Sequence, residues 1–202
     1  MLYQIHRYPA DLIDVVRLRD GQRVLIRPVL PQDEELTSAF FHGLPLRARY
    51  DRFMAAMPHL PPDLVKRFTN VDYLSHVALV AETFAGGRET VVAEARYACG
   101  ADPAVAEFAV SVAEEWQGRG LASLLLGKLI CRAAGAGIVR VVGETLAGNA
   151  RMLHLARKAG FTATPSADVH ELVLLERRLA PGAPGLPCDE GSHVSDPLDL
   201  AP

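Results

Sequence analysis

The sequence has little lysine, little cysteine and no excess of positive charge. Its 202 residues carry 21 Lys or Arg against 24 Asp or Glu, which gives a formal net charge of -3 at pH 7. Lysine occurs only at Lys66, Lys128 and Lys158, and no run of basic residues is present. The composition therefore gives no reason to expect a nucleic-acid or a membrane-surface partner.

The cysteines and histidines show no spacing that is typical of metal or disulfide sites. Cys99, Cys131 and Cys188 are far apart and form no CxxC pair, which predicts reduced thiols in a cytoplasmic protein. The histidines lack metal-ligand spacing, so we expect no metal site. No apolar run approaches the length of about 20 residues that a membrane-crossing helix needs. Residues 1–14 also lack the apolar segment of a signal peptide.

Hydrophobic periodicity and turn signals predict a domain of the α/β or α+β class, with a mixed sheet flanked by helices. Strands are expected at residues 12–18, 23–29, 76–82, 90–98, 104–113, 138–143 and 169–175. Helices are expected from Pro31, at residues 46–54 and 62–68, from Leu121 to the glycines at 135 and 137, and from Asn149 to Gly160. The unbroken apolar segment Ile138–Gly143 suits a strand that is covered on both faces.

Three regions are expected along the chain. Residues 1–19 form an N-terminal extension with a short strand, and residues 20–179 form the folded domain. Residues 180–202 are rich in Pro, Gly and acidic side chains. This tail has too little apolar content to bury a core, so we expect it to be disordered.

The segment that indicates chemistry is Gln117–Ala122, which follows the strand at 104–113 and precedes a helix. Gly118 and Gly120 allow a sharp turn and a close approach of the backbone to a ligand. The helix start presents unpaired N–H groups and the positive end of the helix dipole, an arrangement that suits a pyrophosphate. Arg119 can add a charge-assisted contact.

Three phosphate-binding patterns compete for this segment. The pattern GxxxxGK[ST] fails because six residues separate Gly120 from Gly127, and Leu129 follows the lysine. The dinucleotide pattern GxGxxG fails at its third glycine, where the chain has Ser123. The pattern Q-x-x-G-x-[GA] is matched in full by Gln117–Ala122. The remaining alternative is a purely structural turn from strand to helix.

The matched pattern resembles the acetyl-CoA loop of the GNAT acetyltransferases. The later segments Gly148-Asn149 and Ala159-Gly160-Phe161 strengthen the resemblance, which covers about residues 20–178. Within that family, the segments Ile26-Arg27-Pro28, Arg49–Phe53 and Ala106–Val110 resemble the acetyltransferase domain of bacterial protein-lysine acetyltransferases.

The resemblance implies a fold, a cosubstrate and a set of binding residues. The central sheet is expected to splay apart after the strand at 104–113, and acetyl passes directly from acetyl-CoA to an amine. The pantetheine arm is expected to pair with backbone near Val110, Ser111 and Val112, and Asn149 either bonds that arm or serves as a plain helix cap. The pyrophosphate is expected on Gln117, Gly118, Arg119, Gly120, Leu121 and Ala122.

The acceptor implied by the resemblance is a lysine on a protein such as an acyl-CoA synthetase. Two alternatives stay open: a small-molecule amine as acceptor, and a non-catalytic acyl-CoA-binding module that regulates a partner. The sequence does not indicate an oligomeric state.

Glu107 is the candidate general base. Attack by lysine requires a neutral amine, and the free ammonium has a pKa of about 10.4, so a base must remove a proton near neutral pH. The alternation along the strand places Glu107 on one face with Ala109 and Ser111. The alternative is a solvated or ion-paired glutamate, with Glu114 and Glu115 as other nearby acids.

One position departs from the family pattern. Many GNAT enzymes carry a tyrosine four residues before the Gly-Phe pair as the acid for the leaving thiolate, and here that position is Ala156. Either the thiolate leaves unassisted, or water or another group protonates it. His154 lies on the same helix, but a lone helical histidine is more often a surface or packed residue.

Overall fold

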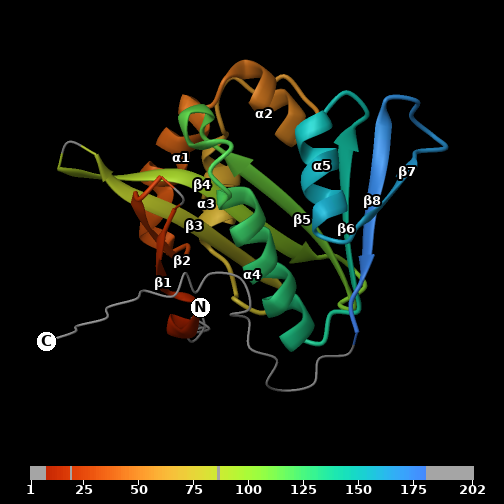
Figure 1. Ribbon diagram of the computed structural model, residues 1–202, viewed down its shortest axis with the longest axis horizontal. Helices are drawn as coiled ribbons and strands as arrows, with labels where there is room; N and C mark the ends of the chain where they lie inside the picture. Colours follow the sequence, from red (N-terminus) through yellow and green to blue (C-terminus); the bar gives the residue numbers. More distant parts are fainter. Residues whose placement is uncertain (1–7, 19, 86, 181–202) are drawn as a thin grey trace, which may run out of the picture.

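The computed structural model describes residues 8–18, 20–85 and 87–180, which form an eight-stranded sheet with helices on both faces (Figure 1). The strand order is β1-β2-β3-β4-β5-β6-β8-β7. The strands are β1 Asp14–Arg17, β2 Arg23–Pro28, β3 His76–Ala85, β4 Arg88–Cys99, β5 Val105–Val112, β6 Arg140–Leu146, β7 Thr162–Pro165 and β8 Leu172–Arg178. The helices are α1 Glu34–Gly43, α2 Leu46–Phe53, α3 Pro62–Thr69, α4 Leu121–Gly135 and α5 Ala150–Lys158, with 3-10 turns η1 Ala10–Leu12, η2 Pro31–Asp33 and η3 Glu114–Trp116.

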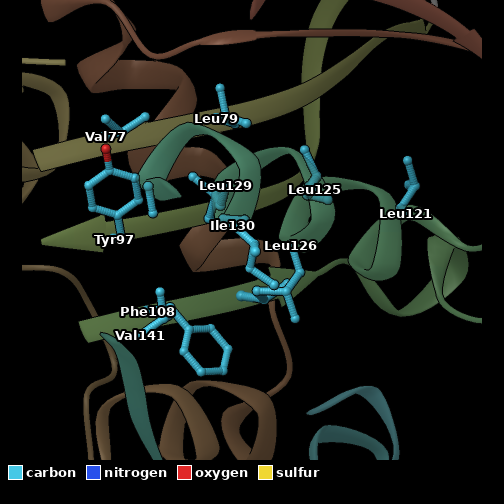
Figure 2. Close-up of a cluster of buried hydrophobic side chains, with 14 of the residues drawn as sticks. Val77, Leu79, Tyr97, Phe108, Leu121, Leu125, Leu126, Leu129, Ile130 and Val141 are labelled. Carbon is cyan, nitrogen blue, oxygen red and sulfur yellow. The ribbon is translucent and has the colours of Figure 1, made fainter. Parts of the chain in front are cut away.

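Two buried clusters lie on opposite faces of the sheet, and they define the names used below. The α4–α5 face carries the larger cluster, in which the apolar stripe of α4 packs on β3, β4, β5 and β6. Figure 2 shows the leucines of α4 against Phe108 of β5 and Val141 of β6, with Tyr97 of β4 nearby. The α1–α3 face carries a second cluster that includes the aromatic rings of Phe40, Phe41 and Phe68.

Strand β4 is the most deeply covered strand because helices lie over both of its faces. Residues 91–97 are buried without interruption. Its apolar residues meet α4 on one side, whereas Glu94 and Arg96 point to the α1–α3 face, where their register partners on β5 are Ser111 and Ala109. The sheet therefore buries two charged residues in the middle of the fold.

Strands β5 and β6 are parallel neighbours for only three residue pairs, which end at Glu107 and Val142. Beyond this point β5 stays paired with β4 and β6 stays paired with β8, so the two strands diverge in a V (Figure 1). The ring of Phe108 lies against the backbone where they part, because a Cβ built on Gly143 would come within 2.7 Å of Phe108 Cε1. The predicted splayed sheet is thus confirmed.

Several predicted elements differ from the observed ones. The first strand begins at Asp14, since Ala10–Leu12 form a 3-10 turn, and β1 pairs with β2 in the main sheet. The last strand lies three residues further along than expected, and β7 was not predicted because its four residues are all exposed. The prediction that 138–143 is covered on both faces is wrong, because burial alternates along β6 and α2 only partly covers its second face. The predictions for residues 1–7 and 181–202 lie outside the described residues.

Candidate active site

The loop Gln117–Gly120 turns sharply between η3 and the start of α4. Gly118 and Gly120 have φ angles of +76° and +92°, in the left-handed region that favours glycine. A Cβ built on either glycine would meet no protein atom within 4 Å, so the outer side of the loop is open. Gly120 provides no side-chain cap, and the first turn of α4 presents N–H groups without helical partners. The loop therefore fits a pyrophosphate group.

Gln117 connects this loop to two other elements through its side-chain amide. Its Nε2 donates to the carbonyl oxygen of Val112 at 3.1 Å, and its Oε1 accepts a hydrogen bond from Arg151 Nη1 on α5. Of the three residues predicted to face the pantetheine arm, Val112 has its carbonyl engaged by Gln117. Val110 and Ser111 lie on the part of β5 that has no partner on β6.

Arg119 is held by protein groups. Its Nη1 donates to Asp20 Oδ2 and Gln22 Oε1, both at 2.7 Å, and its Nη2 donates to the carbonyl oxygen of Glu115 at 2.7 Å. The guanidinium also lies over the Trp116 ring, 4.8 Å from its centroid. Arg119 thus joins the loop to the turn between β1 and β2, and its predicted contact with the pyrophosphate stays a prediction.

Asn149 serves as the N-cap of α5. Its Oδ1 accepts a hydrogen bond from the Met152 amide at 3.1 Å. The side-chain Nδ2 of Asn149 makes no hydrogen bond to the part of the chain that the structure describes. The capping role is confirmed, and the additional contact with the pantetheine arm stays a prediction.

Glu107 is the last residue of β5 that pairs with β6, and its side chain is exposed. It lies on the α1–α3 face, opposite Ala98 of β4 and beside Val142 of β6. The carboxylate therefore stands where the gap between the two strands opens, on the face away from α4.

The same face carries a buried group of charged and polar side chains around Arg96. Arg96 Nε donates to Glu94 Oε1, and both side chains are nearly inaccessible to solvent. Arg96 also donates to the carbonyl oxygen of Phe68 at 3.2 Å, lies over its ring, and approaches His76 Nε2 at 3.2 Å. The second carboxylate oxygen of Glu94 is buried and has no hydrogen-bond partner in the described structure. Burial and the neighbouring Arg96 charge lower the pKa of His76 to about 4.

Arg52 of α2 adds a second cation to this group. Its guanidinium lies 5.0 Å from the ring centroid of Phe53 and 5.7 Å from that of Phe68. Burial lowers the pKa of Arg52 to about 10, while the carboxylates of Glu94 and Glu107 act in the opposite direction. Arg52 is therefore close enough to both glutamates for their charges to act on it.

The other predicted candidates lie away from this arrangement. Glu114 and Glu115 are exposed in η3, His154 is exposed on α5, and Ala156 is fully buried in the core. Cys99 is a free thiol, as expected, and burial raises its pKa. Cys131 engages a partner, so the expectation of a free thiol is not met there.

Two broader absences hold for the described ranges. Within residues 8–18, 20–85 and 87–180, no three His, Cys, Asp or Glu side chains gather in a way that could hold a metal ion. None of the helices in these ranges is long and apolar enough to cross a membrane.

Sequence reasoning missed Arg52, Arg151 and the pair of Glu94 with Arg96. Glu94 and Arg96 occupy alternate positions of a strand rich in buried residues, and that alternation was the available signal. The contacts of Arg52 and Arg151 depend on how α2 and α5 pack, which no local pattern indicates.

A splayed mixed sheet beside a glycine-bearing loop at a helix start defines the class of coenzyme A-dependent acyltransferases. The model described as "Acetyltransferase (GNAT) family" matches residues 46–161. The chain belongs to the GNAT acetyltransferase family.

Three relatives show how far the similarity extends. The chain is 31% identical over 165 residues to Acetyltransferase PA5475 of Pseudomonas aeruginosa, which covers 79% of this chain and 89% of that protein. It is 32% identical over 146 residues to Acetyltransferase Pat of Mycolicibacterium smegmatis, covering 72% of this chain but 43% of Pat. Among solved structures, the GNAT domain of S. lividans PAT superposes with a TM-score of 0.77 at 34% identity, covering 86% of this chain and 100% of that domain.

The chain is therefore an acetyltransferase whose cosubstrate is acetyl-CoA. The structure of the acetyltransferase yncA from Salmonella typhimurium contains its cofactor acetyl-CoA, and it shares the fold with a TM-score of 0.61. That structure covers 79% of this chain and 96% of its own, at 22% identity, so it supports the fold alone.

Proposed function

We propose that the chain acetylates a lysine on a protein, with Glu107 as the general base. The observation that carries the proposal is the position of Glu107, the last paired residue before β5 and β6 diverge. A carboxylate at the apex of the gap can reach an amine that approaches from the α1–α3 face. The resemblance of Arg49–Phe53 and Ala106–Val110 to protein-lysine acetyltransferases supports the choice of acceptor, as does the similarity to Pat.

The coenzyme is proposed to lie on the α4–α5 side of the gap. The amides of Gly118, Gly120, Leu121 and Ala122 would hold the pyrophosphate, because they belong to an open loop at a helix start. The backbone of Val110 and Ser111 and the free amide nitrogen of Asn149 would bind the pantetheine arm. Acetyl-CoA supplies the activated acetyl group when bound there.

The residues of the α1–α3 face would then handle the proton of the acceptor. Glu107 removes a proton from the lysine ammonium, directly or through one water, and the neutral nitrogen attacks the thioester carbonyl. The N–C bond forms as the C–S bond breaks, and the sulfur departs as a thiolate. A thiol has a pKa of about 8.5, so a thiolate can leave without a strong acid at the position of Ala156.

The coenzyme loop is tested with Gly120→Val. Valine is strained at a φ angle of +92° and would fill the open side of the loop. We expect calorimetry to show a large loss of acetyl-CoA affinity. As a matched control, Gly127→Ala replaces a glycine inside α4 whose Cβ would meet no protein atom within 4 Å, and it should bind as the wild type does. Unchanged affinity in Gly120→Val would show that the loop assignment is wrong.

The acceptor is tested by product mapping. The purified protein is incubated with labelled acetyl-CoA and three acceptor pools: a cytoplasmic extract, a purified acyl-CoA synthetase, and a set of small amines. We expect acetyl-lysine in one or a few proteins, with a purified acyl-CoA synthetase as the first candidate. Label only in small amines would favour a small-molecule acetyltransferase. Binding of acetyl-CoA without any product in all three pools would favour a non-catalytic acyl-CoA-binding module.

A further inference from the structure

Arg151 reaches from the first turn of α5 to the loop that begins α4. Its Nη1 donates to Oε1 of Gln117, while Gln117 Nε2 holds the carbonyl oxygen of Val112 at the end of β5. Arg151 is exposed and forms no ion pair with any carboxylate of the described residues. The hydrogen-bond partner of this cation is thus a neutral amide of the coenzyme loop.

The position of Arg151 on its helix is unfavourable for a cation. The N-terminus of a helix carries a partial positive charge, which repels a guanidinium in the first turn. Helix α5 has no acidic residue in that turn to offset the repulsion, and its N-terminus is capped by Asn149. Arg157 and Lys158 lie in the last turn, where the dipole favours them. The stability of α5 therefore does not explain an arginine at position 151.

The other arginine at the loop is already engaged. Arg119 places its hydrogen bonds on Asp20, Gln22 and the Glu115 carbonyl, and its guanidinium lies over Trp116. Its charge is compensated by the ion pair with Asp20. The α4 helix start, the α5 helix start and the unpaired charge of Arg151 all favour a negative group near the loop.

We propose that Arg151 binds a phosphate of acetyl-CoA, either the pyrophosphate or the 3′-phosphate, and that Arg119 positions the loop without contacting the coenzyme. The guanidinium exchanges the neutral oxygen of Gln117 for a charged phosphate oxygen, which gives a shorter and stronger hydrogen bond. The inference rests on the proposed coenzyme loop, and it does not depend on the identity of the acceptor.

The test compares the binding of three ligands by calorimetry: coenzyme A, dephospho-coenzyme A and pantetheine, which carries no phosphate. We expect Arg151→Ala to weaken coenzyme A binding by about tenfold or more, as the loss of a charge-assisted hydrogen bond does, and to leave pantetheine binding unchanged. A loss that persists with dephospho-coenzyme A assigns Arg151 to the pyrophosphate, and a loss that disappears assigns it to the 3′-phosphate. Arg157→Ala, on the same helix, is the matched control and should bind all three ligands as the wild type does.

A purely structural role would give different results. Wild-type affinity of Arg151→Ala for coenzyme A would overturn the proposal, and so would an equal loss for pantetheine. If Arg151 acted only by holding Gln117, the double variant Gln117→Ala/Arg151→Ala would bind no more weakly than Gln117→Ala alone, and this result would also overturn it. We expect the double variant to be weaker by a further factor of about ten. Gly120→Val separates the two levels: if it keeps its affinity, the loop assignment itself fails.

Discussion

The two faces of the sheet are both covered by helices, but they differ in charge. The cluster on the α4–α5 face contains no charged side chain among the residues that the structure describes as its buried core. The α1–α3 face buries Asp33, Glu82, Glu94 and Arg96. Since a buried ion pair contributes little to stability compared with apolar packing, the charges on the second face are better explained by function.

The charges on the α1–α3 face fall into two groups with different degrees of compensation. In the first, Arg27 pairs with Asp33 at 2.6 Å and with Glu82 at 2.8 Å, and Asp33 also accepts from the Leu30 amide at 2.7 Å. Burial alone would lower the pKa of Arg27, but these two partners raise it. In the second group, one oxygen of Glu94 lacks a hydrogen-bond partner. The incompletely satisfied group is the one near Glu107, which supports this end of the face as the acceptor site.

The largest expected effect comes from removing the proposed base. Glu107→Gln keeps the shape of the side chain and removes its basicity, so the rate at neutral pH should fall by about 10²–10⁴-fold. Acetyl-CoA affinity should survive, because the coenzyme loop lies on the other side of the gap. The measurement is a pH–rate profile of wild type and variant with one identified acceptor. The wild-type rate should rise with pH, and the variant should recover only where the free amine is abundant.

The matched control for this variant is Glu114→Gln, an exposed glutamate in η3. It should leave the rate unchanged. Equal rates of Glu107→Gln and wild type at neutral pH would remove Glu107 from the mechanism. A joint loss of rate and coenzyme binding would instead indicate that Glu107 has a structural role.

The second prediction concerns the buried pair of Glu94 and Arg96. Arg96→Met leaves the Glu94 carboxylate buried without its cation, which should lower the free energy of unfolding by about 3–5 kcal/mol. The double variant Glu94→Leu/Arg96→Met should recover most of this loss, because the uncompensated charge is removed as well. Denaturant unfolding measures both values. A double variant as unstable as Arg96→Met would mean that Arg96 acts mainly through Phe68 rather than through the ion pair.

An exposed ion pair on the same side of the molecule gives the contrast. Arg47 and Asp51 pair at 2.9 Å on α2, with the Arg47 side chain 68% exposed. Arg47→Met should change the free energy of unfolding by less than about 0.5 kcal/mol, as solvent screens such a pair. A loss comparable to that of Arg96→Met would contradict the distinction between buried and exposed pairs on this face.

The third prediction sharpens the contrast from the apolar side. Gly143→Ala would place a methyl group 2.7 Å from Phe108 Cε1, and that ring is buried against Phe161 with a centroid distance of 4.8 Å. We expect a loss of about 1–3 kcal/mol from overpacking. Gly127→Ala, inside α4 with open space around its Cβ, should instead stabilise the protein by up to about 1 kcal/mol. Thermal unfolding of both variants decides the matter, and equal effects would mean that Phe108 moves aside without cost.

The features that could be predicted from the sequence depend on short segments. The loop Gln117–Ala122 and the position of Glu107 on its strand follow from local spacing and alternation, and the splay followed from the family resemblance. The charge of Arg119 was visible, but its engagement with Asp20 was not, because residues about a hundred positions apart meet only in the folded sheet. The same holds for Arg151 and Arg52. Strand β7 was missed because the pairing with β8, rather than burial, defines it.

The smallest expected effect is a pH dependence of stability that originates at His76. Burial and the Arg96 charge hold the pKa of His76 at about 4 in the folded protein, against 6.5 for the free side chain. Between these values the unfolded chain binds a proton that the folded protein does not, so acid favours unfolding. The contribution of His76 is fully present above pH 6.5 and is lost as the pH falls toward 4. At pH 5 the loss should be about 1 kcal/mol, after allowance for the partial exposure of the ring.

His76→Gln removes this titration while keeping a polar group beside Arg96. Its free energy of unfolding should therefore fall less steeply than that of the wild type between pH 6.5 and pH 4, as measured by denaturant unfolding across the range. His154→Gln, which changes an exposed histidine on α5, controls for the loss of any imidazole and should keep the wild-type slope. Asp72 and Glu94 also face His76 and act on its pKa in the opposite direction to Arg96. An unchanged slope in His76→Gln would mean that the carboxylates of the α1–α3 face, rather than the histidine, set its sensitivity to acid.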